Sequence, residues 1–198
     1  MLTEDVEDAV KDLRYLMNRG YPRDSAVEYV SDHYQLELEK RHFLARCVFS
    51  ANEVQDHQSR LIEGSEVEGR EIGVDGYNVL ITVETILEGG RVIRCDDGFI
   101  RDLQAVFGKY KMTDSTDRAL IEVLETLEVM NPSRVVVLFD KQVSKSGELA
   151  GFARRKIDEM DFDGGARTTV GTDAKVWEYE VSASSDRVTG MAPTRSSC

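Results

Sequence analysis

The chain has 198 residues, of which 41% are hydrophobic, and a formal net charge of -12. This hydrophobic content suits one domain of ordinary size with a small second one, and it excludes a generally disordered chain. No apolar run approaches the roughly 20 residues that a membrane span needs, and the acidic start is unlike a signal peptide. We therefore expect a cytoplasmic protein without a membrane partner. The acidic balance argues against a generic polyanion-binding surface, but a carboxylate metal site is itself acidic, so a nucleic-acid enzyme is not excluded.

The cysteines and histidines give no sign of a zinc site or a disulfide scaffold. Cys47, Cys95 and Cys198 are odd in number, far apart in the sequence and without a CxxC pair. The three histidines lack metal-ligand spacing, and we interpret them as helix-surface or partly buried side chains.

Residues 1–68 are predicted to form a small all-α region. Apolar residues recur at helical spacing from Val6 to Met17, and the glycine and proline of residues 18–22 are a strong stop signal. Further helices are predicted over 24–33 and from near Leu38, and the polar residues 51–68 resemble a helix tail that fades into a linker. A helix-turn-helix-like nucleic-acid reader would use the basic residues Arg19, Arg23, Lys40, Arg41 and Arg46. They are too few and too scattered, so a helical cap or a homodimer surface is the preferred interpretation.

From residue 69 onward, strand patterns alternate with helix patterns. Strands are predicted over residues 71–74, 134–139 and, from a weaker pattern, 178–183. Helical stripes are predicted over residues 79–87, 99–107, 119–127 and 149–160. The continuous apolar run Val135-Val136-Val137-Leu138 is typical of a strand buried on both faces of a parallel sheet. Residues 69–198 are therefore predicted to form an α/β three-layer sandwich with a central parallel sheet, whose first strand lies near the centre.

Three predicted strands end on an aspartate: Asp75, Asp140 and Asp186. Because the carboxyl ends of parallel strands share one edge of a sheet, these three carboxylates should converge there. They would repel one another unless a cation lay among them, and hard oxygen ligands suit Mg²⁺ or Mn²⁺. An aspartate after a strand is often only a helix N-cap, but Gly76 allows a sharp turn after Asp75, and Asn78 can hold that carboxylate or a water.

Two further groups could complete this site. Asp97, followed by Gly98, is the preferred fourth carboxylate, with Asp102 and Asp173 as alternatives; each of these acids could instead be an ordinary helix-terminal or loop residue. A local basic, hydroxyl-rich segment precedes a helix predicted from near Glu148, and a helix N-terminus suits phosphate. Its candidate substrate-binding residues are Lys141, Ser144, Lys145 and Ser146, although a serine cap with solvated lysines would look the same.

At these residues the sequence resembles a known nuclease family. The segment Asp75-Gly76-Tyr77-Asn78-Val79 resembles the opening of the NYN branch of PIN-like nucleases, residues 137–140 resemble their middle strand, and Ser184-Ser185-Asp186 resembles their late motif. The whole chain resembles an uncharacterised archaeal family with a helical N-terminal region and a PIN-like C-terminal domain, and the likeness covers most of residues 5–155. The segments that carry it are residues 12–22, 75–82, 96–102 and 144–150.

The resemblance implies a metal-dependent nuclease that hydrolyses phosphodiesters of single-stranded or structured RNA with a metal-activated water. Asp75, Asn78, Asp140 and Asp186 would be its catalytic residues. The alternative is a PIN-like module without catalysis that binds RNA or protein. A weaker alternative is a phosphohydrolase for small phosphoesters, but a phosphoaspartate mechanism needs a second aspartate where this chain has Tyr77.

Overall fold

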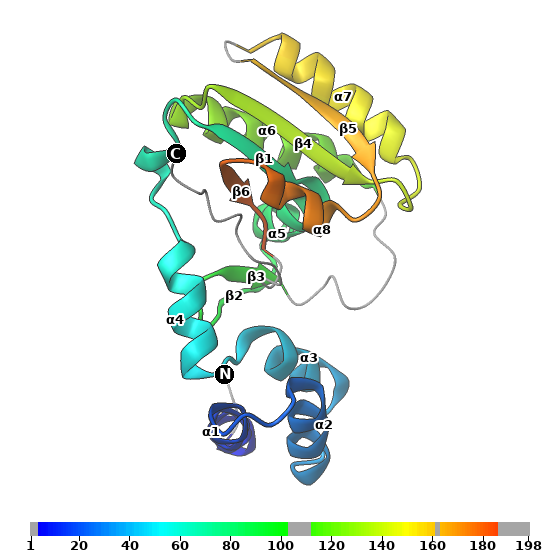
Figure 1. Cartoon of the computed structure of the whole chain (residues 1–198). Coiled ribbons are helices and arrows are strands. Elements are labelled where there is room, and N and C mark those ends of the chain that lie inside the picture. Colours follow the sequence, from blue (N-terminus) through cyan, green and yellow to red (C-terminus); the bar gives the residue numbers. More distant parts are fainter. Residues whose placement is uncertain (1–3, 103–111, 161–162, 186–198) are drawn as a thin grey trace, which may run out of the picture. The chain divides into compact units, whose positions relative to one another are not determined.

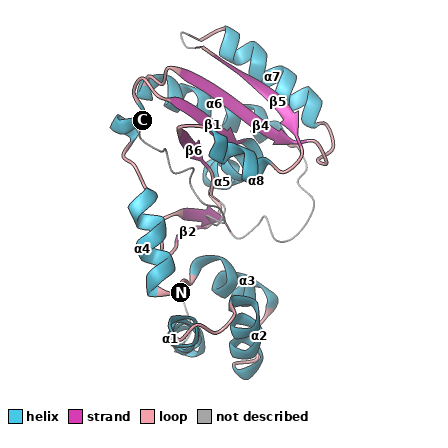
Figure 2. Cartoon of the chain, in the orientation of Figure 1, coloured by secondary structure: helices cyan, strands magenta, loops and turns pink. Residues whose placement is uncertain are grey.

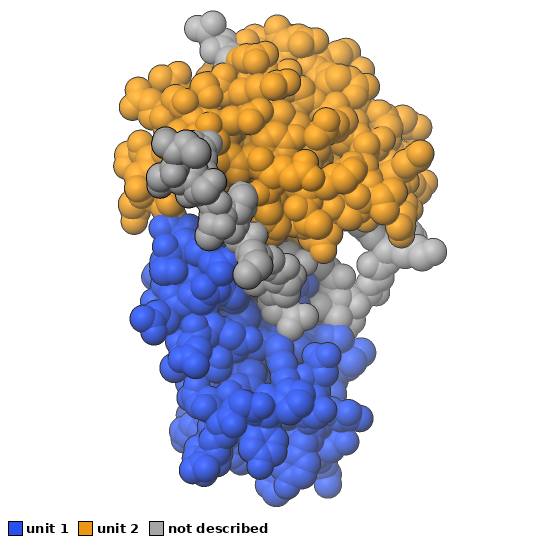
Figure 3. Space-filling model, viewed as in Figure 1, with its two compact units in different colours: residues 1–61, 91–106 blue, residues 62–90, 107–198 orange. Residues whose placement is uncertain are grey.

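The computed structural model describes residues 4–102, 112–160 and 163–185. It divides the chain into two compact units, which are coloured separately in Figure 3. Unit 1 contains residues 1–61 and 91–106, and unit 2 contains residues 62–90 and 107–198. The predicted boundary lay at residue 68, whereas in this division unit 1 ends at residue 61 and also includes residues 91–106. No helix in the described part of the chain has the length and apolar character to cross a bilayer.

The described residues of unit 1 form four helices and a short hairpin, whose arrangement can be followed in Figure 1. The helices are α1 (Glu4–Asn18), α2 (Arg23–His33), α3 (Leu38–Cys47) and α4 (Ala51–Arg60), and the antiparallel strands are β2 (Val92–Arg94) and β3 (Ile100–Asp102). The apolar faces of α1, α2 and α3 form one core, as their helical spacing predicted. The core side chains include Val6, Leu13, Met17, Ala26, Val30 and Leu44.

Two predictions in this unit are wrong. Residues 51–60 are not the tail of the preceding helix but a separate helix, because Ser50 and Glu53 form a capping box at its start. Residues 100–102 form strand β3 instead of part of a helix. The turn before it is closed by a hydrogen bond from the Gly98 amide to the Cys95 carbonyl (2.9 Å), and Gly98 has a φ of 90°, which glycine adopts readily. The rest of that apolar stripe, from residue 103, lies outside the described residues.

In the described part of unit 2, four parallel strands form a sheet in the order β5-β4-β1-β6 (Figure 2). In chain order its elements are η1 (Gly64–Val67), β1 (Glu71–Asp75), α5 (Gly76–Leu87), α6 (Asp114–Met130), β4 (Arg134–Asp140), α7 (Ser146–Asp158), β5 (Gly164–Thr169), α8 (Thr172–Lys175), η3 (Val176–Glu178) and β6 (Val181–Ala183). The predicted central parallel sheet is confirmed, and β1 is one of its two inner strands.

Helices cover both faces of this sheet. The alternate residues Val135, Val137 and Phe139 of β4 pack in the larger core with α5, α6 and α7. The intervening Val136 and Leu138 pack with residues of η3 on the other face. The apolar run of β4 is therefore buried on both faces, as its sequence predicted.

The strand order places β1 at a topological switch point. From β1 the chain adds β4 and then β5 on one side, and it returns to add β6 on the other side of β1. In open parallel sheets, ligands bind outside the carboxyl ends of the strands where the winding reverses in this way. Here those ends belong to β1 and β6, namely Asp75 and the residues after Ala183.

The turn from β1 into α5 requires a glycine, and this can be tested. A Cβ atom at Gly76 would lie 2.5 Å from Cε1 of Phe139 and 2.9 Å from the carbonyl oxygen of Leu138. We expect Gly76→Ala to lower the free energy of unfolding of unit 2 by about 1–3 kcal/mol through overpacking. Gly147→Ala in α7 is the matched control, because a Cβ there meets nothing within 4 Å. Urea denaturation of both variants measures the difference, and equal stabilities would contradict the close packing at Gly76.

Candidate active site

Asp75 is the last residue of the inner strand β1, and its side chain is almost fully buried, with 1% exposure. One of its carboxylate oxygens, Oδ2, accepts hydrogen bonds from Nδ2 of Asn78 (2.6 Å) and from Oγ of Ser184 (3.3 Å). Asp75 also precedes α5, but its side chain makes no capping hydrogen bond to that helix. The structure therefore does not support the interpretation of Asp75 as a simple helix N-cap.

The end of β6 is joined to the first turn of α5 by serine side chains. Ser185 Oγ donates to the carbonyl oxygen of Asn78 (2.9 Å), which also accepts from Thr82 Oγ1 (3.2 Å). The Asn78 carbonyl is thus held by Ser185, which follows β6, and by Thr82 of its own helix. The side-chain amide of Asn78 donates to Asp75. The structure brings together Asp75, Asn78 and Ser184, as expected from strand ends that share one edge. Asp186, the predicted third carboxylate, lies outside the described residues.

Asp140 ends the neighbouring strand β4. The register pairs Asp75 with Leu138, so Asp140 lies two residues further along the same edge of the sheet. Its Oδ1 accepts from the amide of Gln142 (2.8 Å). Burial of the Tyr77 side chain, together with the negative charge of Asp140, raises the pKa of Tyr77 to about 12. The phenol is therefore protonated at neutral pH. Tyr77 was not predicted as a site residue; its position two residues after Asp75 was the only sequence signal.

The donor atoms at this edge fit a hard divalent cation. They are carboxylate oxygens from Asp75 and Asp140, and Ser184 adds a hydroxyl oxygen close to the first of these. No group of three or more acidic, histidine or cysteine side chains converges as a metal site within the part of the chain that the structure describes. Mg²⁺ in proteins is commonly held by only one or two carboxylates, with water and substrate phosphate completing its coordination.

The predicted phosphate-binding segment directly follows Asp140. Lys141, Ser144 and Lys145 are exposed, and Ser146 is buried as the first residue of α7. The helix therefore begins two residues earlier than predicted. Its N-cap residue is Lys145, in the left-handed conformation and without a side-chain capping hydrogen bond. An ordinary serine cap is thus not what the structure shows at this helix start.

Asp97, the predicted fourth carboxylate, lies in unit 1 and is engaged there. Its side chain is fully buried and accepts two hydrogen bonds of 2.7 Å from the guanidinium of Arg101, while Nδ1 of His57 lies 2.9 Å from Oδ2. These contacts satisfy the Asp97 carboxylate within unit 1, and the metal site proposed below does not include Asp97. Asp102 is also buried in unit 1, on β3, and Asp173 lies in the first turn of the short helix α8.

Two of the basic residues suggested as a nucleic-acid reader have structural partners inside unit 1. Arg23 donates to the carbonyl oxygens of Ala45 (2.9 Å) and Val48 (2.6 Å). Arg41 donates to the carbonyl oxygen of Leu36 (2.7 Å) and to Asp32 (2.6 Å). Both arginines therefore hold the helices together, which favours the structural interpretation of this region.

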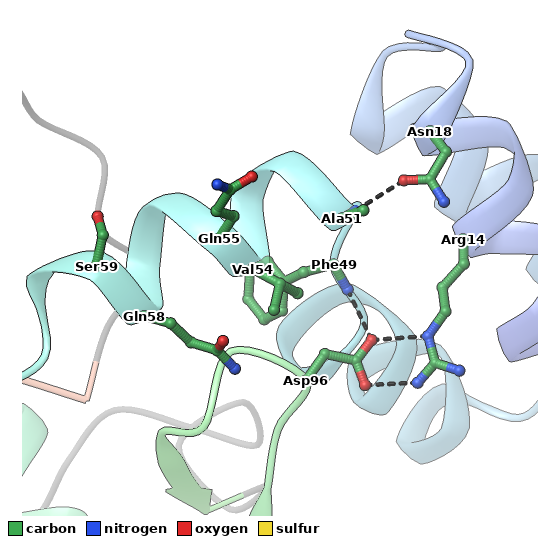
Figure 4. A pocket seen from close by; sticks show the side chains of 9 residues that line it. All are labelled: Arg14, Asn18, Phe49, Ala51, Val54, Gln55, Gln58, Ser59 and Asp96. Atoms are coloured by element: carbon green, nitrogen blue, oxygen red, sulfur yellow. Dashed lines mark hydrogen bonds and ion pairs between the residues drawn. The ribbon is translucent and has the colours of Figure 1, made fainter.

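Unit 1 also contains a pocket of about 690 Å³ (Figure 4). Arg14 forms a two-point ion pair with Asp96 across it (2.8 and 2.5 Å), and Asp96 also accepts from the Phe49 amide (3.2 Å). Asn18 accepts from the Ala51 amide on the same side (2.7 Å). The charged groups of this pocket are paired with one another, so the strand edge of unit 2 is the stronger candidate active site.

Comparisons with known proteins identify the family. Residues 64–189 match the domain of unknown function DUF5616, and residues 5–60 match the protein of unknown function DUF434. The chain is also 37% identical over 183 residues to the uncharacterized protein MJ0935 of Methanocaldococcus jannaschii. The match covers 92% of this chain and 88% of that protein. No solved structure matches the chain. The chain therefore belongs to the DUF5616 family, with a DUF434 segment preceding the DUF5616 domain.

Proposed function

We propose that unit 2 is a PIN-like, metal-dependent nuclease that hydrolyses phosphodiester bonds of RNA. The proposal depends above all on Asp75, a buried carboxylate at the carboxyl end of an inner parallel strand, beside the switch point of the sheet. Burial of a charged carboxylate is costly unless other charges or hydrogen bonds offset it. Asn78 and Ser184 supply neutral hydrogen bonds, and a divalent cation would supply the positive charge.

The residues of the site divide the work as follows. When bound, a Mg²⁺ or Mn²⁺ ion would lower the pKa of a water molecule and would stabilise negative charge on the phosphate. Asp75 and Asp140 would hold the ion, with Asp186 as the further ligand that the sequence suggests. Asn78 orients the Asp75 carboxylate through the 2.6 Å hydrogen bond between their side chains.

The exposed segment after Asp140 would bind the phosphate next to the scissile one. Lys141 and Lys145 carry positive charge, Ser144 carries a hydroxyl, and the start of α7 presents backbone amides. The choice of RNA as the substrate follows from the resemblance to NYN-type nucleases.

The test is cleavage of labelled single-stranded RNA by the full chain with Mn²⁺, Mg²⁺ or EDTA. We expect cleavage of oligonucleotides that requires the metal and stops with EDTA, and no comparable hydrolysis of a small phosphomonoester. RNA binding without cleavage under every metal and salt condition would instead support a non-catalytic PIN-like module. Preferential hydrolysis of the phosphomonoester would support a phosphohydrolase.

The role of Lys145 gives a separate prediction. Lys145→Gln should weaken RNA binding and lower the slope of log affinity against log salt by about 0.7, the value for one phosphate contact on a single strand. Lysine and glutamine would both occupy this left-handed backbone position, so the substitution leaves the conformational free energy of the backbone unchanged. Fluorescence anisotropy of labelled RNA at several salt concentrations measures the slope. Lys11→Gln is the control, since Lys11 is paired with Asp8 in unit 1; an equal effect of both variants would contradict the assignment.

A further inference from the structure

Two cysteines that are far apart in the sequence come together in unit 1. Cys47 is the last residue of α3, and Cys95 follows β2 directly. The amide of Asp96, the residue after Cys95, donates to the carbonyl oxygen of Cys47 at 3.0 Å. This hydrogen bond holds the two cysteine backbones next to each other, and the two thiols lie within hydrogen-bond reach of one another.

The side chains of the two cysteines lie in one buried cluster with Phe49. Both thiols are free. The hydrogen bond from the Cys47 thiol lowers the pKa of Cys95, and the buried guanidinium of Arg101 lowers it further, although burial acts in the opposite direction. The same contact with Cys95, together with burial, raises the pKa of Cys47. Cys95 is therefore the more readily ionised thiol of the pair.

A pocket of about 410 Å³ gives small molecules access to this pair. Both cysteines line it, and its charged lining residues are Lys11, Arg14, Arg94, Glu7 and Asp96. Cys95 is 6% exposed and Cys47 is 2% exposed.

We propose that Cys95 and Cys47 form a reversible disulfide by exchange with low-molecular-weight disulfides, with Cys95 as the attacking sulfur and Cys47 as the resolving one. In the first step the Cys95 thiolate attacks one sulfur of the small disulfide, whose S–S bond breaks and releases one thiolate. Cys95 then carries the other half as a mixed disulfide.

In the second step Cys47 resolves this mixed disulfide. The Cys47 thiol transfers its proton to the small thiolate that was released in the first step. The Cys47 sulfur attacks the Cys95 sulfur and releases the second small thiol. In sum, two protein thiols become one disulfide while one small disulfide becomes two thiols. The bond joins the two chain segments, 1–61 and 91–106, from which unit 1 is built.

The test uses the full chain with Cys198→Ser as the background, so that only the two cysteines of the pair can react. Oxidised glutathione is added to the native protein, and intact mass and peptide mapping follow the products. We expect loss of both free thiols, an internal link between residues 47 and 95, and its reversal by dithiothreitol.

Two single variants in the same background identify the order of the steps. Cys47→Ser should accumulate glutathione on Cys95, because the resolving thiol is absent. Cys95→Ser should react at Cys47 at least about tenfold more slowly, since that thiol has the higher pKa and is more buried. Equal rates in the two variants, or thiols that react only after denaturation, would overturn the proposal. Circular dichroism of each variant before oxidation confirms that the comparison concerns folded protein.

Discussion

Replacement of Asp75 by asparagine is expected to abolish metal-dependent RNA cleavage while leaving the protein folded. The substitution keeps the shape of the side chain and removes its charge, so the proposed ion would lose a charged ligand at the carboxyl end of β1. A bound metal contributes several kcal/mol to stabilising the transition state, and each 1.4 kcal/mol is a factor of ten, so we expect a loss of about a thousandfold or more. Thermal stability in EDTA should be equal or slightly higher, because a buried negative charge is gone.

The control for this experiment is Asp163→Asn. Asp163 is an exposed aspartate of unit 2 that directly precedes β5, so it lies at the amino end of the parallel sheet and is paired loosely with Arg134 (3.6 Å). We expect it to cleave RNA as the unmodified chain does. Equal cleavage by the Asp75→Asn protein would mean that the activity belongs to another site or to a contaminant.

The second large effect is expected on the stability of unit 1. Asp97 and Arg101 form a two-point ion pair whose side chains are 0% and 1% exposed. Arg101 also stacks over Phe49 and Phe99, at 5.3 and 5.2 Å from the ring centres. Asp97→Asn removes the negative charge of the two-point pair with this buried arginine, and breaking a buried pair in this way costs about 3–5 kcal/mol.

Asp96→Asn is the matched control for that variant. Asp96 is the adjacent residue, but its partner Arg14 is 45% exposed, and pairs of that kind contribute about 1 kcal/mol or less. Hydrogen exchange measured peptide by peptide would locate the effect, and we expect faster exchange in unit 1 for Asp97→Asn and little change in unit 2. Equal losses for the two variants would contradict the structural role given to Asp97.

The pH dependence of unit 1 follows from the same pair. Burial acts to raise the pKa of Asp97, but Arg101, His57 and the Phe99 amide outweigh it, and the pKa lies below its usual value. A carboxyl group of this kind contributes its full stabilisation above the unfolded-state pKa of about 3.9. That stabilisation is lost as pH falls through the lower folded-state pKa. The stability gap between the unmodified chain and Asp97→Asn, measured by urea denaturation, should therefore be largest near neutral pH and shrink below about pH 4. A stability difference that does not change with pH would contradict its assignment to the charge of Asp97.

The sheet could be predicted because its signals are local. The run from Val135 to Leu138 identifies a strand buried on both faces, and Asp75 followed by Gly76 identifies a strand that turns sharply into a helix. The placement of Asp75, Asn78 and Ser184 at one edge then follows from the parallel arrangement alone. The roles given to these residues depend in addition on the resemblance to PIN-like nucleases, and they stay a proposal.

The interior of unit 1 could not be predicted because it depends on contacts between distant residues. Cys47 and Cys95 are brought together by the hairpin, whose strand β3 looked helical in the sequence. The same hairpin gives Asp97 a partner four residues away in Arg101 and another on α4 in His57. The glycine after Asp97 suggested that Asp97 is a metal ligand. Its partners Arg101 and His57 instead make Asp97 a buried anion with a structural role in unit 1.

The measurement that tests the proposed site most directly is a crystal structure of the full chain soaked in Mn²⁺, with the ion located by its anomalous scattering. The account predicts a peak at the carboxyl end of β1, within about 2.0–2.3 Å of a carboxylate oxygen of Asp75 and with Asp140 as a direct or water-mediated ligand. The same peak should vanish in Asp75→Asn crystals. A structure with Mn²⁺ at saturating concentration, no peak beside Asp75 and an ordered, unliganded Asp140 would contradict the proposed metal site.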